Sequence, residues 1–197
     1  VGSEMCIRDS HNFRQRLLAG DCLIGTFVKT PSMMVAEVLA STDLDVVCID
    51  AEHAPFDRAA IDSCLLAYRA AQMPALVRVP AAAPEHILNA LDCGATGVVV
   101  PHVDSAAKAS GCANASRYGS SGRGYAGSTR AAGYGGASVD ENIALNHGEN
   151  TVIAQIEDLA ALEQIDAIAA EEGIDCLFIG MMDLTVALGA DSAADPR

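Results

Sequence analysis

The chain has 197 residues, of which 51% are hydrophobic and only 4% aromatic. This length and composition suit one sizeable core with helices packed closely on strands, as in an α/β protein. The formal net charge of −14 argues against binding to nucleic-acid phosphates or to anionic membrane surfaces. An acidic substrate would need a local arginine or a metal ion to hold it.

The seven cysteines are odd in number, and none forms a C-x-x-C pair. Most of them stand in apolar runs, as Cys48 does in VVCID and Cys176 does in IDCLFIG. We interpret them as small buried hydrophobic residues of a reducing compartment, which predicts a cytoplasmic protein. No apolar run approaches the ~18 residues of a membrane span, and the start lacks the pattern of a secretory signal.

Both ends of the chain are predicted to be unusual. Residues 1–10 (VGSEMCIRDS) match no pattern downstream and are interpreted as a non-native, artefactual tail. Residues 11–197 are interpreted as a single partial-barrel domain. The sequence stops soon after a strong strand motif, so we expect a fragment that lacks C-terminal units.

Short apolar runs alternate with longer amphipathic ones, which is typical of βαβ units. Six runs are predicted to be parallel strands: residues 23–28, 46–50, 75–79, 97–100, 152–156 and 176–179. Helices are predicted over residues 33–40, 58–72, 84–92, from 106 onward, and 158–171. The glycine-rich stretch 119–136 is predicted to be a long functional or mobile loop.

Two architectures fit this pattern, a doubly wound sheet and a (β/α)8 barrel of typically ~250 residues that lacks its last units. In a barrel, chemical residues should follow the C-terminal ends of several strands. The polar residues at these positions are Asp50, Glu52, His53, Arg78, His102, Asp104, Gln155, Glu157 and Asp183. Their placement after five successive strands predicts one shared mouth and favours an incomplete (β/α)8 TIM barrel of about six βα units.

Glu157 and Asp183 supply hard carboxylate oxygens, which suit octahedral Mg²⁺ or Mn²⁺ together with waters and substrate oxygens. Each carboxylate alone fits equally well as a cap of the helix that follows it. Gly180 permits close backbone approach, so the amides near Met182 and Asp183 can bind a substrate carboxylate. These residues therefore predict a metal and substrate site after the last two strands.

His53 is a natural acid or base near neutral pH, and Asp50 on the same strand end can orient it. Arg78 offers a permanent planar cation for a carboxylate or an enolate oxygen. The alternatives are that His53 is an ordinary loop histidine and that Arg78 forms a structural ion pair with Glu52. Lys29 follows the first strand and leaves a Schiff-base mechanism formally open.

The glycine-rich loop contains GRGYAG at residues 122–127, which matches the dinucleotide pattern G-x-G-x-x-G. That pattern binds a dinucleotide when it directly follows a strand and opens a helix, whereas here it follows a helix. We interpret the loop as a flexible segment near the mouth. Arg123 and Arg130 are then expected to reach the distal end of an anionic substrate.

The order of the motifs IDAEHAP, ALVRVP, GATGVVVPHVD, the Gly-Arg-Gly loop, VIAQIED and GIDCLFIGMMDLTVALG resembles the HpcH/HpaI aldolases. These are metal-dependent enzymes that act on 4-hydroxy-2-oxo acids. The resemblance runs from about Asn12 to the C-terminus. It departs from the family where Gly180-Met181-Met182-Asp183-Leu184 stands in place of the usual Gly-Pro-x-Asp-Leu, and in the absent last two strands and C-terminal helix.

The resemblance implies a (β/α)8 barrel whose divalent metal, Mg²⁺, Mn²⁺ or Co²⁺, is held by Glu157 and Asp183. It implies that pyruvate binds this metal through its carboxylate and keto oxygens, with Gln155 beside the metal or its water. Arg78 would stabilise the enolate oxygen, and His53, supported by Asp50, would move the aldol proton. A homo-oligomer, a hexamer in the complete protein, is also implied.

Three functions remain open from the sequence. The first is retro-aldol cleavage of a 4-hydroxy-2-oxo acid to pyruvate and an aldehyde. The second is a thioester lyase of the citrate-lyase β-subunit or malyl-CoA type, and the histidine of IDAEHAP favours the aldolase over it. The third is an inactive, truncated fragment of the aldolase.

Overall fold

The computed structural model describes residues 12–192 and 194, so the prediction for residues 1–10 falls outside the described residues. Its strands are β1 (Gly25–Val28), β2 (Val46–Asp50), β3 (Ala75–Arg78), β4 (Gly97–Val100), β5 (Thr151–Ile156) and β6 (Cys176–Ile179). Its helices are α1 (Phe13–Leu18), α2 (Met33–Ala40), α3 (Arg58–Ala70), α4 (Pro84–Asp92), α5 (Ala106–Ser116), η2 (Gly133–Gly135), α6 (Val139–Glu149), α7 (Leu159–Glu163), α8 (Ile165–Ala169) and α9 (Met181–Ala187).

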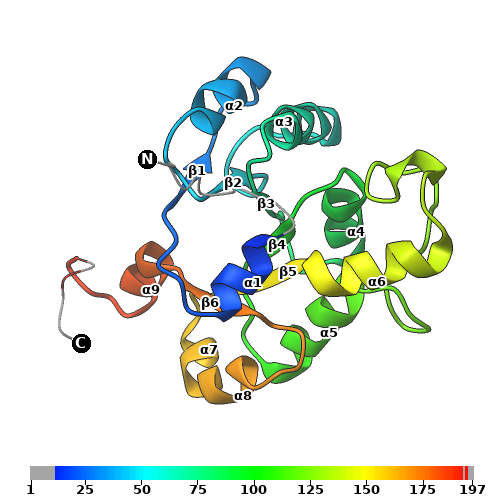
Figure 1. The fold of residues 1–197 in the computed structure, drawn as a ribbon. Coiled ribbons are helices and arrows are strands. Elements are labelled where there is room, and N and C mark those ends of the chain that lie inside the picture. Colours follow the sequence, from blue (N-terminus) through cyan, green and yellow to red (C-terminus); the bar gives the residue numbers. More distant parts are fainter. Residues whose placement is uncertain (1–11, 193, 195–197) are drawn as a thin grey trace, which may run out of the picture.

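The six strands form one parallel sheet in the order β1-β2-β3-β4-β5-β6. A doubly wound sheet would reverse its strand order at a switch point, and this sheet does not. Because each crossover continues in the same direction, the sheet curls and the helices surround it (Figure 1). The predicted α/β class and barrel architecture are therefore confirmed, with six βα units in place.

Alternate residues of each strand face two different cores. One large cluster lies between the strands and the surrounding helices and includes Val47, Ile49 and Val98. A smaller cluster fills the inside of the curled sheet with Cys48, Leu76, Val99, Ile153 and Phe13. Burial on both faces explains why these strands are apolar throughout instead of alternating.

Helix α1 lies across the N-terminal end of the barrel interior and inserts Phe13, which is 3% exposed. Arg14 Nε and Nη2 donate to Asp175 Oδ1 at 3.0 and 2.7 Å. The other oxygen of Asp175 accepts from the backbone N–H of Val152 at 2.9 Å. One carboxylate therefore joins α1, the start of β5 and the segment that leads into β6.

Two predicted helix starts are confirmed by their capping bonds, because the side chains of Asp57 and Ser105 accept from backbone N–H groups of α3 and α5. The predicted helix over 158–171 was wrong as a single element, since Gln164 interrupts it and divides it into α7 and α8. Helix α6 was missed, although Ser138 and Glu141 form a capping box at its start.

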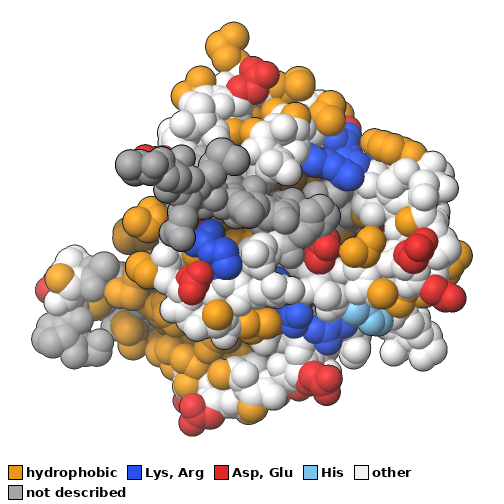
Figure 2. All heavy atoms as spheres, in the orientation of Figure 1, with side chains coloured by type: hydrophobic (Ala, Val, Ile, Leu, Met, Phe, Trp, Pro, Cys, Tyr) orange, Lys and Arg blue, Asp and Glu red, His pale blue; other side chains and the backbone are white. Residues whose placement is uncertain are grey.

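The open edge of the sheet carries exposed apolar side chains. Phe178 and Ile179 of β6 are 36% and 40% exposed, and Met182 and Val186 of α9 are more so. Hydrophobic atoms gather on this side of the molecule in Figure 2. None of the helices within residues 12–192 has the length and apolar character needed to cross a bilayer.

Candidate active site

The predicted polar residues lie mainly where β2, β3, β4 and β5 end, at the barrel's C-terminal mouth. Asp50 and Arg78 are the last residues of β2 and β3 and are paired in the parallel register. Gln155 lies in β5 opposite Phe178 of β6, and Glu157 directly follows β5. Parallel pairing brings these strand ends to one edge, as expected for a barrel active site.

Asp50 and Arg78 form a bidentate ion pair at the mouth. Arg78 Nε donates to Asp50 Oδ1 at 3.0 Å and Nη2 donates to Oδ2 at 2.8 Å. The Asp50 side chain is fully buried, and Lys29 Nζ lies 3.5 Å from its Oδ2. Burial alone raises the pKa of Asp50, but the hydrogen bonds and charge of Arg78 outweigh it and the net pKa is lowered. Arg78 also stacks over Phe27 at 4.7 Å.

His53 is held differently from the expectation. Asp50 Oδ1 accepts from the backbone N–H of His53 at 3.0 Å, so Asp50 positions the main chain and not the imidazole ring. The ring nitrogen Nε2 instead lies 3.7 Å from Glu52 Oε2. The His53 side chain is 56% exposed, so it is open to a substrate that enters the mouth. Glu52 also lies 3.3 Å from Arg78 Nε, which gives the ion pair weighed as an alternative.

Glu52, His102 and Glu157 bring their ligand atoms within 4.8 Å of one another. Glu157 Oε1 accepts from the His102 backbone N–H at 2.8 Å, and Gln155 Nε2 donates to Glu157 Oε2. His102 Nδ1 lies 3.4 Å from Glu157 Oε1, and its Nε2 lies 3.9 Å from Glu52 Oε1. The candidate site is therefore wider than predicted, because Glu52 and His102 join Glu157.

Burial raises the pKa of Glu52, and the charge of Glu157 adds to this while Arg78 opposes it. His102 is at φ +55°, a left-handed conformation that non-glycine residues rarely adopt. Burial lowers the pKa of His102, but Asp158, Glu157 and Glu52 outweigh it and the net pKa is raised. The cluster therefore favours a positive charge among its acidic groups.

The residues after β6 lie in a short helix. Gly180 precedes α9 and donates its N–H to Ile156 O at 2.9 Å, so this amide is already used. Asp183 and Met182 stand in the first turn of α9 and are exposed. Among the described residues, Asp183 is outside the group of gathered ligand atoms. Its role as a metal ligand stays a prediction.

The glycine-rich loop does not direct its arginines to this mouth. Arg130 Nη2 donates to Asp62 Oδ2 at 2.7 Å, and Arg123 is buried beside Asp92 and Tyr118. The prediction that both reach the distal end of a bound substrate is wrong for this subunit. Arg130 is held by Asp62 of α3, and Arg123 donates to the hydroxyl of Tyr118, just before the loop.

The donor set fits a divalent cation. Gln155 is 1% exposed, yet within residues 12–192 its Oε1 has no hydrogen-bond partner, and Glu52 Oε2 accepts none either. Buried polar atoms are normally satisfied, so the Gln155 oxygen beside Glu157 calls for a partner, whereas Glu52 Oε2 already has the charge of Arg78 Nε at 3.3 Å. Carboxylate and amide oxygens with one imidazole are suitable ligands for Mg²⁺, Mn²⁺ or Co²⁺.

We expect Gly180→Ala to disturb this site through steric overlap and not through backbone strain, because any residue can adopt the φ of −79° found at Gly180. A Cβ there would lie 2.7 Å from Glu157 Cβ and 3.0 Å from Oε2. Displacement of Glu157 should weaken divalent-metal binding by roughly 10- to 100-fold. Mn²⁺ titration followed by electron paramagnetic resonance measures this. Gly148→Ala is the control, because its Cβ would meet nothing within 4 Å, and equal effects of the two would contradict the prediction.

Comparison with known proteins identifies the family of the chain. Residues 23–196 match the sequence profile of the family described as HpcH/HpaI aldolase/citrate lyase. The chain belongs to the HpcH/HpaI aldolase/citrate lyase family. A hydroxypyruvate/pyruvate aldolase from Paraburkholderia phytofirmans is 36% identical over 183 residues, which cover 89% of this chain and 70% of that protein.

A second relative of the HpcH/HpaI family is a 5-keto-4-deoxy-D-glucarate aldolase from Shigella boydii, 33% identical over 91% of this chain and 69% of its own length. A crystal structure of an HpcH/HpaI aldolase/citrate lyase family protein from Burkholderia cenocepacia superposes with a TM-score of 0.87 at 35% identity. It covers 94% of this chain and 75% of that one. The predicted family is therefore confirmed.

Proposed function

We propose that this chain is a divalent-metal-dependent carbon–carbon lyase that cleaves a 4-hydroxy-2-oxo acid to pyruvate and an aldehyde. The observation that carries the proposal is the cluster of Glu52, His102 and Glu157 next to the Asp50–Arg78 pair. Relatives named as hydroxypyruvate/pyruvate and 5-keto-4-deoxy-D-glucarate aldolases support a small oxo acid as substrate.

In this reaction a base takes the proton of the 4-hydroxyl group, and that oxygen forms the carbonyl of the aldehyde as the C3–C4 bond breaks. The bonding electrons move to the keto group at C2, which becomes an enolate. A proton then adds to C3 and gives pyruvate. No oxidant or reductant is needed, and the enzyme must stabilise the negative charge that develops on the keto oxygen.

Three residues supply acid–base and electrostatic catalysis in this proposal. Arg78 stabilises the developing charge on the keto oxygen, and Asp50 holds its guanidinium in a fixed orientation through two hydrogen bonds. His53 transfers the hydroxyl proton, since its exposed ring is accessible and Glu52 lies beside it. Asp50 also fixes the main chain of His53.

Glu157 would hold the metal, with Asp183 as the second ligand expected from the family and Glu52 and His102 as neighbours. When bound, the metal supplies Lewis-acid polarisation of the keto group. Gln155 would contact the substrate or the metal's water. Met182 and Asp183 would hold the substrate carboxylate through first-turn amides of α9, which have no partner within their own helix, and Gly180 leaves the room beside Glu157 that this approach needs.

The test is pyruvate release from 4-hydroxy-2-oxo acids with and without EDTA, in the wild type, in Glu157→Gln and in the control Glu163→Gln. We expect EDTA and Glu157→Gln to reduce release by at least about 100-fold. Glu163 is exposed in α7, so its variant should retain activity. Release that survives both EDTA and Glu157→Gln would reject the metal site and direct attention to Lys29.

The thioester lyase is the second outcome of this test. A folded protein that leaves every 4-hydroxy-2-oxo acid intact and cleaves malyl-CoA would overturn the aldolase proposal. We further propose that the protein acts in the cytoplasm as a homo-oligomer. The cytoplasmic location is supported by the six described cysteines, all of which are free thiols.

A further inference from the structure

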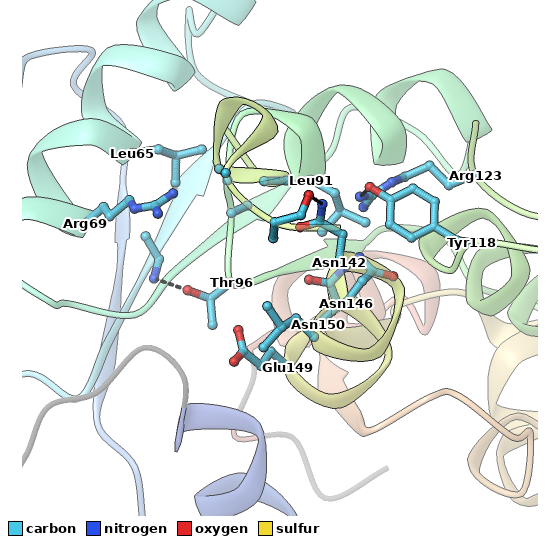
Figure 3. A pocket seen from close by; sticks show the side chains of 18 of the residues that line it. Leu65, Arg69, Leu91, Thr96, Tyr118, Arg123, Asn142, Asn146, Glu149 and Asn150 are labelled. Atoms are coloured by element: carbon cyan, nitrogen blue, oxygen red, sulfur yellow. Dashed lines mark hydrogen bonds between the residues drawn. The ribbon is translucent and has the colours of Figure 1, made fainter. Parts of the chain in front are cut away.

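A cavity of about 440 Å³ lies at the opposite end of the barrel from the mouth. It is bounded by the starts of β3 and β4, the ends of α3 and α4, the glycine-rich loop and helix α6. Figure 3 shows Leu65 and Arg69 on one side and Tyr118 and Arg123 on the other, with Thr96 between them. Neither the proposed reaction nor its metal uses this space.

Arg123 is the most unusual group in the wall. Its side chain is fully buried, and its Nη2 donates to the hydroxyl of Tyr118, whose ring lies 4.2 Å from the guanidinium carbon. Its Nε and Nη1 have no hydrogen-bond partner among the described residues. Asp92 Oδ1 is 3.8 Å from Nε, too far for a hydrogen bond, and is itself without a partner there. A buried guanidinium with free N–H groups requires an acceptor.

Helix α6 presents amide groups to the same cavity. Asn142 and Asn146, four residues apart, and Asn150 at the end of the helix lie along one face, and Figure 3 shows all three side by side. Within residues 12–192, the buried Asn146 Oδ1 and Asn150 Nδ2 have no partner. The residues that line the cavity therefore include unpartnered donors at Arg123 and Asn150 and an unpartnered acceptor at Asn146.

We propose that this cavity binds a small carboxylic acid that also carries a hydroxyl group. The carboxylate matches the donors of Arg123 and Asn150, and the hydroxyl matches the acceptor of Asn146. Asp92 Oδ1 lies 3.8 Å from Arg123 Nε, so a single negative charge is favoured over the double charge of phosphate. Binding here is separate from catalysis, because the lining residues lie at the N-terminal ends of the strands.

The experiment is isothermal titration of the EDTA-treated protein with sodium D-glycerate, glycerol and sodium orthophosphate. D-glycerate should bind with one-to-one stoichiometry, and glycerol, which lacks the carboxylate, at least tenfold more weakly. Orthophosphate should also bind at least tenfold more weakly than D-glycerate. No heat from D-glycerate would overturn the proposal and leave a water-filled cavity, and tighter binding of orthophosphate would overturn the carboxylate assignment.

Two variants locate the ligand. Asn150→Asp replaces the free donor with an acceptor of the same shape, and Arg123→Lys removes the planar fork but keeps the charge; each should weaken D-glycerate binding at least tenfold. Asn114→Asp is the matched control, because Asn114 is exposed on α5, and this variant should leave D-glycerate binding unchanged. Circular dichroism checks that each variant folds. If Arg123→Lys does not fold, the result for Asn150→Asp decides the test.

The double variant Asp50→Asn/Arg78→Met tests whether D-glycerate binds at the catalytic mouth instead of in the cavity. It removes the Arg78 cation of the mouth together with the negative charge of Asp50. D-glycerate binding should persist in this protein. Binding that disappears in it and survives Asn150→Asp would assign the ligand to the mouth and overturn the proposal. Because no turnover is measured, failure of the lyase proposal leaves this test intact.

Discussion

Arg78→Met should abolish most activity and also destabilise the fold. Loss of a preorganised cation at the developing oxyanion should lower kcat by roughly 10²- to 10³-fold. The same change leaves the fully buried Asp50 without its bidentate partner, with the His53 N–H at 3.0 Å and Lys29 Nζ at 3.5 Å among its remaining neighbours. An uncompensated buried carboxylate should reduce the free energy of unfolding by about 3 kcal/mol. Pyruvate-release kinetics and urea denaturation measure the two effects.

The double variant Asp50→Asn/Arg78→Met separates these two contributions. Removing the charge of Asp50 should recover much of the lost unfolding free energy, because no buried ion is left unpaired. Activity should stay as low as in Arg78→Met, since the cation is still absent. If activity recovered together with stability, Arg78 would be a structural residue and its catalytic assignment would be rejected.

Gly97→Ala should cause the largest loss of stability at any glycine of the sheet. Gly97 pairs with Thr151 across β4 and β5, and a Cβ there would lie 2.2 Å from the Thr151 carbonyl oxygen and 2.8 Å from its Cβ. Neither atom can rotate away, so two central strands must separate. We expect the free energy of unfolding to fall by about 3 kcal/mol or more, or the protein to remain unfolded.

Gly111→Ala is the matched control, because this glycine lies within α5 and a Cβ would meet nothing within 4 Å. It should stabilise the protein by roughly 0.5–1 kcal/mol through the higher helix propensity of alanine. Thermal and urea unfolding of both variants provide the measurement. Similar losses from the two substitutions would contradict the assignment of strand contact as the cause.

Strands were predictable here because burial on both faces leaves runs such as VVCID and GVVV without polar interruption. Helix α6 carried its own start signal in Ser138 and Glu141, but a polar face and a preceding run of glycines obscured it. The break at Gln164 has no proline or glycine to announce it. It depends on how α7 and α8 pack, which local sequence does not encode.

The sequence predicted which strand ends carry the candidate site, but it did not predict how the side chains there contact one another. Asp50 and Arg78 were expected at one mouth, and pairing of adjacent strands brings them together. The approach of His102 to Glu157 depends on a left-handed backbone at His102 itself, which histidine adopts more often than most non-glycine residues but still uncommonly. Asn142, Asn146 and Asn150 repeat every fourth position, a spacing that could have revealed a polar helix face.

The carboxylate of Asp175 has a consequence for how the chain folds during synthesis. Each strand pairs with the next along the sequence, so βα units can add one after another as they leave the ribosome. Helix α1 is the exception, because Arg14 finds its partner 161 residues later. Helix α1 must therefore wait for the segment that leads into β6, and until then Phe13 and the barrel interior that it covers remain exposed to chaperones and to aggregation.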